Sequence, residues 1–192
     1  MSKLVLSHLE SLESSIRKHA GADIWELVKD DLKSIKENSK LEYVAIKMQE
    51  AINTLIKAVD EKAFLNIMFE RGCYCANSHM NDIEKKRTEY IKKGSIDEYI
   101  DSLVNTKTPG LYYFRDGKEL YLAYKTRELK VGCYCPLLRK LSDGALLPQA
   151  YCECSRAFVQ YTWERVLERN VTVELEGSCM SGKGECRFKI TV

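Results

Sequence analysis

The sequence predicts an α/β (α+β) protein in which N-terminal helices pack on an antiparallel-sheet ligand-binding domain. Apolar residues recur at helical spacing through the first hundred residues. After Thr108-Pro109-Gly110 the pattern changes to short, Tyr-rich segments typical of strands. We therefore expect a helical region at 1–105 and an α/β region at 106–192. They should form one cooperative unit, because only Thr106–Gly110 resembles a linker between them.

The helical region is predicted from apolar stripes and from residues that favour helix ends. The first helix should end at Gly21, and Asp23 can cap the second. A capping box at Ser39–Glu42 is expected to open the third helix. Helical character continues through Glu61–Phe69 and is predicted to stop at Gly72. The stripe of the first helix is Val5, Leu9, Leu12 and Ile16, and that of the third is Leu41, Val44, Met48, Ile52, Leu55 and Val59.

Two shorter helices should follow, one from Ser78 to Lys93 and one opened by a second capping box at Ser95–Glu98. In the α/β region, the sequence Asp116-Gly117 between two strand-like segments predicts a hairpin turn. A loop and a helix reaching about Arg169 come after the third strand. The expected strands are Leu111–Phe114, Glu119–Lys125, Leu129–Cys135, Val171–Ser178 and Glu185–Val192.

Composition excludes several classes of protein. Thirty Lys and Arg balance 28 Asp and Glu, so nothing indicates a nucleic-acid-binding tail. Hydrophobic residues make up 45% of the chain and only three residues are Pro, which argues against disorder. No apolar run approaches the ~20 residues that a membrane span needs, and the N-terminus is too polar for a secretory signal. We expect a cytoplasmic protein.

The eight cysteines are the unusual feature, because six of them form Cys-x-Cys pairs. Two pairs lie in the same tetrapeptide, Gly-Cys-Tyr-Cys, at 72–75 and 132–135. Disulfides are disfavoured in a chain without an export signal. On an extended chain, residues i and i+2 point the same way, so each pair could present two sulfurs to one metal. The candidate ligands are Cys133, Cys135, Cys152 and Cys154, with Cys179 and Cys186 in reserve and Cys73 and Cys75 as a possible second pair.

Zinc is the metal that this thiol-rich set favours. His79 could add a nitrogen ligand, whereas His8 and His19 lie on amphipathic helices and are assigned structural roles. Cys152 and Cys154 would point roughly 160–200° apart inside a helix, so a shared site requires them to precede it. Two alternatives stay open: reduced core thiols that line a pocket, and thiol redox chemistry.

The tail of the chain resembles the 4-vinyl-reductase-type ligand-binding domains. The pattern is Val-x-Val-Glu, a Cys, a Gly-containing turn and Cys-x-Phe, here Val171, Val173, Glu174, Cys179, Gly182, Gly184, Cys186 and Phe188. The resemblance covers Leu111–Val192 and implies an internal pocket in a fold shared with nitric-oxide-sensing haem domains. The haem-binding branch needs an axial His, and no His follows His79, so no haem is expected.

The same tail is similar to that of aminothiazoline-carboxylate hydrolases, which also carry a Cys-rich helix end like Arg71–Cys75. The favoured function is thus a small-molecule-binding protein with a zinc site. The alternative is a hydrolase of thiazoline-like rings, in which a zinc-bound water or Cys154 attacks and Glu153 or Glu174 moves protons. The expected partner is a small molecule, with no nucleic acid and no membrane. Homodimerisation is left open.

Overall fold

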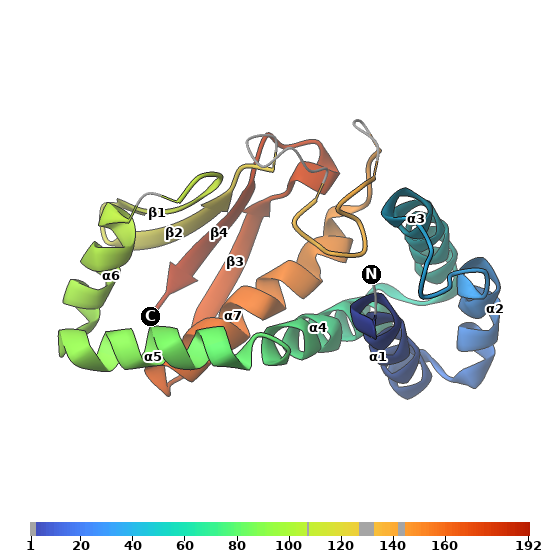
Figure 1. The fold of residues 1–192 in the computed structure, drawn as a ribbon, viewed down its shortest axis with the longest axis horizontal. Helices are drawn as coiled ribbons and strands as arrows, with labels where there is room; N and C mark the ends of the chain where they lie inside the picture. Colours follow the sequence, from blue (N-terminus) through green and yellow to red (C-terminus); the bar gives the residue numbers. More distant parts are fainter. Residues whose placement is uncertain (1–2, 107, 127–132, 142–144) are drawn as a thin grey trace.

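A computed structural model describes residues 3–106, 108–126, 133–141 and 145–192. Within these ranges the chain forms seven α-helices and a four-stranded antiparallel sheet. Helices α1–α3 gather at one end of the molecule, and the sheet with α5–α7 forms the other (Figure 1). The helices are α1 (Lys3–Ala20), α2 (Ala22–Leu32), α3 (Leu41–Ala58), α4 (Glu61–Asn77), α5 (Met80–Lys93), α6 (Ile96–Asn105) and α7 (Glu153–Leu167). The strands are β1 (Leu111–Asp116), β2 (Glu119–Tyr124), β3 (Thr172–Gly177) and β4 (Cys186–Thr191).

The predicted helices of the N-terminal region are present, with corrections at their ends. Gly21 separates α1 from α2 at a φ of 94°, a conformation that suits a residue without Cβ. Ser95 caps α6 as expected, because its Oγ accepts a hydrogen bond from the Glu98 amide at 3.2 Å. The capping box at Ser39 is wrong. The Ser39 Oγ instead accepts from the amide of Lys36 at 2.8 Å, and Lys40 precedes the helix without a side-chain cap.

The predicted end of α4 at Gly72 is also wrong, because the helix continues to Asn77 and includes both nearby cysteines. Ser78 ends α4 by donating from its Oγ to the Cys75 carbonyl at 2.7 Å, and α5 begins at Met80. Gly72 serves the packing of two helices instead. A Cβ at Gly72 would lie 2.2 Å from the carbonyl oxygen of Cys154 and 2.6 Å from the Cβ of Ala157, both on α7. The absence of a side chain therefore lets α4 and α7 meet closely.

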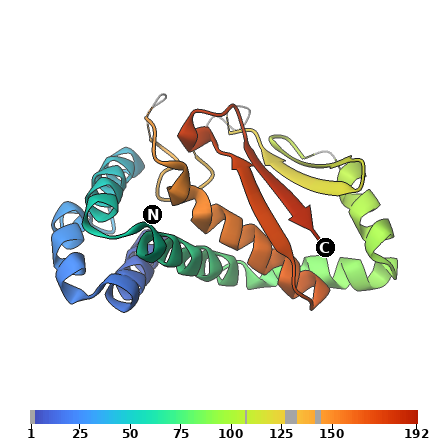
Figure 2. The same ribbon diagram turned by 180° about the vertical axis from the view of Figure 1, so that it is seen from behind.

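The sheet has the strand order β1-β2-β4-β3, with every neighbouring pair antiparallel. Leu122 pairs with Phe188, and Phe188 pairs with Leu175 across the next ladder. The predicted strand at 129–135 lies partly outside the described residues, and its described end, 133–135, is an irregular turn. Helix α7 lies along one face of the sheet, beside β3 (Figure 2).

Two groups of buried side chains hold the molecule together. The first fills the space among α1–α4 and includes Trp25, Val28, Ile52 and Ile67. The second lies under the sheet and includes Tyr99, Trp163, Phe188 and Ile190. None of the helices in the described part of the chain could cross a membrane.

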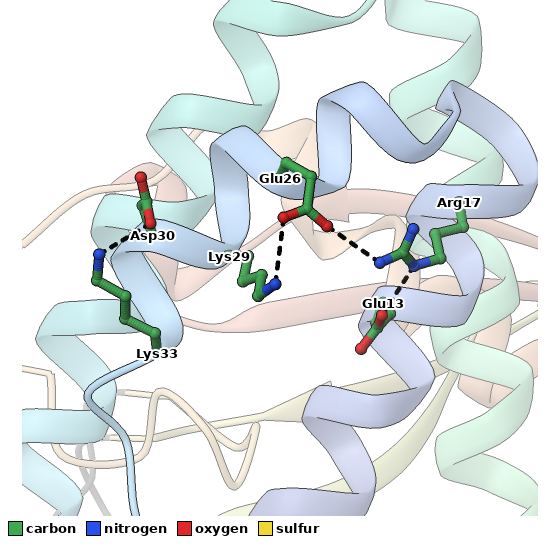
Figure 3. Close-up of polar contacts among 6 residues, drawn as sticks. All are labelled: Glu13, Arg17, Glu26, Lys29, Asp30 and Lys33. Carbon is green, nitrogen blue, oxygen red and sulfur yellow. Dashed lines mark hydrogen bonds and ion pairs between the residues drawn. The ribbon is translucent and has the colours of Figure 1, made fainter.

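Exposed ion pairs join α1 to α2 on the surface. Arg17 contacts Glu13 on its own helix at 2.8 Å and Glu26 on α2 at 3.2 Å (Figure 3). Lys29 completes the chain of charges by contacting Glu26 at 3.1 Å. Solvent screens such exposed pairs, so they contribute little to the stability of the fold.

Candidate functional site

The site is built around a cavity of about 410 Å³ between the N-terminal helices and α7. Most of its wall is apolar. Side chains from α1, α3, α4, α5, α7 and the segment 133–139 contribute to it, together with Leu111 and Tyr124 from the sheet. The apolar lining includes Leu12, Ile52, Ile83, Leu111, Leu137 and Phe158. A cavity of this size and character falls within the range of about 300–1,000 Å³ that is usual for small-molecule sites.

Five sulfur-containing side chains also face this space: Met48, Met68, Cys75, Cys135 and Cys154. Burial raises the pKa of Cys75 to about 11 and holds that of Cys154 well above its usual range, with neighbouring thiols adding to both effects. These two thiols therefore stay protonated near neutral pH. They make the wall soft and polarisable rather than charged.

Three cationic side chains lie in the cavity wall. Arg71 on α4 is buried, Lys86 on α5 is half-buried and Arg139 is exposed. Burial lowers the pKa of Lys86, and the negative charges of Asp82 and Glu89 partly oppose this shift. Asp82 is the one acidic residue in the described lining, and it is exposed.

His8 on α1 lies in the same wall and is buried, with a relative exposure of 3%. Burial lowers its pKa to about 4, and the nearby positive charge of Arg71 acts in the same direction. The imidazole is therefore neutral at pH 7 and has a free nitrogen lone pair. Within the described residues, no hydrogen bond to either ring nitrogen is formed.

The described residues of the two Gly-Cys-Tyr-Cys copies differ in structure, but the tyrosine of each copy lies close to the cavity. In the first copy, on α4, the ring of Tyr74 meets the His8 ring edge-on at 5.8 Å. In the second copy, in the irregular turn, Tyr134 stacks on Tyr124 with ring centroids 4.9 Å apart. Tyr134 is 46% exposed, so it covers Tyr124 from the solvent side.

Two of the three Cys-x-Cys pairs do not present their sulfurs as the sequence pattern predicts. Cys73 and Cys75 lie on a helix rather than on an extended chain, so they project from different sides of α4. Only Cys75 lines the cavity. Cys152 immediately precedes α7, whereas Cys154 lies within its first turn.

Four of the predicted ligands, Cys133, Cys135, Cys152 and Cys154, do lie near one another. The Cys135 amide donates to the Sγ of Cys133 at 3.4 Å, and the Cys135 Sγ lies 3.5 Å from the Tyr151 hydroxyl. Burial raises the pKa of Cys133 and Cys152, with Cys135 adding to the effect in each case. These thiols belong to the packed interior beside the cavity.

Cys179 and Cys186 are also neighbours, as the turn between the last two strands predicts. The Cys179 amide donates to the Cys186 Sγ at 3.4 Å. All eight cysteines are free. Across the described parts of the chain, no group of three or more His, Cys, Asp or Glu side chains is arranged to hold a metal ion.

Comparison with solved structures identifies the fold. The chain is similar to an H-NOX protein from Shewanella oneidensis in the Fe(II)NO ligation state, with 12% identity, 96% of each chain covered and a TM-score of 0.50. The SO2144 H-NOX domain from the same organism, in the Fe(II)CO ligation state, matches with 13% identity, the same coverage and a TM-score of 0.47. The first match shows that this α+β chain has an H-NOX-like fold.

The family is shown by a model that matches residues 8–192, described as a family of unknown function (DUF6144). The chain belongs to this family. No curated protein matches it.

These findings correct the functional predictions made from the sequence. The 4-vinyl-reductase resemblance is wrong, because the similar structures are H-NOX domains and the matching family is DUF6144. The zinc site and the hydrolase alternative are likewise unsupported: the neighbours are of another class, and the described thiols form no metal-holding group. The exclusion of haem is also wrong, because the H-NOX protein that shares this fold was solved in an Fe(II)NO ligation state.

The donor chemistry of the cavity fits a haem. His8 offers a neutral imidazole, one of the axial ligands that haem iron takes. Arg71 and Lys86 offer cations for the two propionates, and the remaining wall is largely apolar. The reasoning that excluded haem considered only histidines that follow residue 79 in the chain, whereas His8 comes from the first helix.

Sequence reasoning missed His8 and Arg71 as functional candidates. A readable signal existed for Arg71, because it lies three and four residues after Met68 and Ile67 on the buried face of α4. A charged residue on an apolar helix face requires a partner. No comparable signal marks His8, whose role depends on segments far away in the sequence.

Proposed function

We propose that this chain is a small-molecule-binding domain whose ligand occupies the cavity between the N-terminal helices and α7. The observation that carries the proposal is the cavity itself: about 410 Å³, mostly apolar, with a few polar groups that converge on it. The similar H-NOX structure supports it, because the Fe(II)NO state of that protein is a small-molecule complex in the same fold.

The first test fills the cavity. Ser155 lines it from the first turn of α7, so Ser155→Trp should occupy the ligand space. Arg165→Trp, at an exposed position on the same helix, is the matched control. Wild type and control should bind a neutral polarity-sensitive dye, Nile red, saturably and at one site, and Ser155→Trp should bind it at least about tenfold more weakly, as excluded-volume clashes predict. Equal binding by all three proteins would contradict the proposal.

Haem is a second candidate for the occupant, favoured by the neutral imidazole of His8 in the wall. His8 would hold the iron, while Arg71 and Lys86 would hold the propionates. A haem bound there would supply an iron that can take a diatomic gas as its further ligand. Within the chain itself, the apolar wall would exclude water, and Tyr134 would shield the solvent side of Tyr124.

Reconstitution tests this candidate. The purified protein is titrated with haemin, and the position and saturation of the Soret band are recorded. In the wild type and in His79→Ala, the Soret band should shift and the titration should saturate at one haem per chain. Because His79 is exposed at the edge of the cavity, its replacement should leave haem binding intact. His8→Ala should lose the wild-type spectrum. A band identical to that of free haemin in the wild type would exclude haem and leave the cavity open to other ligands.

A further inference from the structure

The cavity wall contains a buried cation that has no counter-ion among the described residues. Arg71 is 8% exposed and lies in the cavity wall. Its guanidinium donates one hydrogen bond, from Nη1 to the backbone carbonyl of His8. A guanidinium carries five N–H donors, so this bond leaves most of its donor capacity unused.

The nearby carboxylates are engaged elsewhere. Glu70, the preceding residue, contacts Lys18 at 2.9 Å and His19 at 2.6 Å. Asp82 lies 3.3 Å from Lys85 and 4.0 Å from His79. No ion pair joins Arg71 to a carboxylate anywhere in the described residues. A charge that is buried without a partner is strongly unfavourable, so an anionic group bound in the cavity would stabilise Arg71.

The rest of the lining makes the cavity positive overall. Lys86 and Arg139 add two cations, and Asp82 is the single anion among the lining residues described. His8 is a base, so it can add no negative charge. Burial raises the pKa of the Cys75 and Cys154 thiols, so they add no negative charge near neutral pH. Among the lining residues described, none therefore neutralises Arg71.

We propose that the ligand of this cavity carries an anionic group, such as a carboxylate, that pairs with Arg71, while its apolar body lies along the leucine, isoleucine and methionine side chains. This inference rests on the proposed function, since it names the chemical class of the ligand. A guanidinium binds a carboxylate through two parallel hydrogen bonds, which fixes the orientation of the ligand as well as adding affinity. Both a fatty-acid-like molecule and a haem with its propionates belong to this class.

A structural role for Arg71 is the competing explanation. Its hydrogen bond to the His8 carbonyl joins α4 to α1, and this bond alone could account for an arginine at this position. Such a role makes no distinction between charged and neutral ligands. Ligand selectivity is therefore the property that separates the two explanations.

The experiment compares two probes with the same apolar chain, decanoate and decanol, as competitors of Nile red bound to the full-length protein. For the wild type at neutral pH, decanoate should bind about 10–100-fold more tightly than decanol, as expected for a hydrogen-bonded charge pair away from water. In Arg71→Met this preference should disappear while decanol still binds. Arg169→Met removes the same charge from an exposed position that is not part of the cavity lining, and it should keep the preference.

Each outcome separates the inference from the proposed function. If neither probe displaces the dye from the wild type, the proposed function fails. If decanol binds the wild type as well as decanoate does, the cavity binds ligands but the assignment to Arg71 is overturned. If Arg71→Met does not fold, the wild-type comparison of the two probes still tests whether the cavity prefers an anion, and Arg71→Lys tests the assignment to Arg71. Arg71→Lys should then retain a weaker preference for decanoate, because a lysine keeps the charge but lacks the planar pair of donors.

Discussion

Cys179 differs from the other cysteines because hydrogen-bond donors converge on its sulfur. The thiol of Cys186 is the largest influence, and the hydroxyl and amide of Thr126 add to it; together they lower the pKa of Cys179 to about 6. The same interaction raises the pKa of Cys186. The interaction therefore favours the thiolate at the half-buried Cys179 and the protonated thiol at Cys186.

We predict that Cys179 is alkylated faster than Cys75 or Cys152 at pH 7, because only the thiolate attacks and the pKa of each of the other two is about 11. The rate of iodoacetamide labelling, followed by mass spectrometry of peptides, should be half-maximal near pH 6. Thr126→Val removes one donor and should move the midpoint upward. A Cys179 rate that rises only above pH 8 would refute the prediction.

His8 gives a second prediction at the scale of one residue. Its pKa is about 4 in the folded chain and 6.5 ordinarily, so below pH 6.5 the unfolded state binds a proton that the folded state refuses. The free energy of unfolding should therefore fall as the pH drops from about 6.5 to 4, and change no further from this cause below 4. Urea titrations across this range should show a flatter dependence for His8→Gln than for the wild type. Parallel curves for the two proteins would contradict this assignment.

At the scale of elements, the close contact of α4 with α7 depends on Gly72. In Gly72→Ala the new methyl would meet the Cys154 carbonyl, a backbone atom that cannot rotate away. The helices must separate, and we expect a loss of about 3 kcal/mol or more in the free energy of unfolding. Gly184→Ala is the control, because a Cβ there meets nothing within 4 Å and the φ angle is not positive. Denaturant unfolding measures both variants, and similar stabilities would show that the contact yields easily.

The same glycine shows why some helix ends were predictable and others were not. Gly21 ends a helix, and the sequence predicts it correctly, because the apolar stripe of α1 ends there too. Gly72 was also predicted to end a helix. Its role is instead to leave space for Cys154 and Ala157, which lie more than eighty residues later in the sequence. The Cys-x-Cys interpretation is wrong at its first pair for a related reason. It assumed an extended chain at Cys73–Cys75, where the backbone is helical.

At the scale of the whole molecule, the sheet and most helices follow from local patterns, but the cavity does not. A strand alternates buried and exposed side chains, and a helix buries one face, wherever the element lies in the fold. The periodicity of each can therefore be recognised in a short stretch of sequence. The cavity combines His8 from α1 with Thr162 from α7, and Arg71 from α4 with Arg139 from a turn. Only the assembled fold brings these residues together, which is why the sequence indicated a pocket without indicating its lining.

The division into 1–105 and 106–192 as one cooperative unit stays a prediction, and the packing of α4 on α7 across that boundary supports it. The chain has two tryptophans, Trp25 in the first buried group and Trp163 in the second. Trp163→Phe leaves a reporter of the helical end, and Trp25→Phe leaves a reporter of the sheet end. In each variant we expect the urea midpoint from tryptophan fluorescence to coincide with that from far-ultraviolet circular dichroism, as two-state unfolding requires. A fluorescence midpoint that departs from the dichroism midpoint in the same variant would show that the two ends unfold separately.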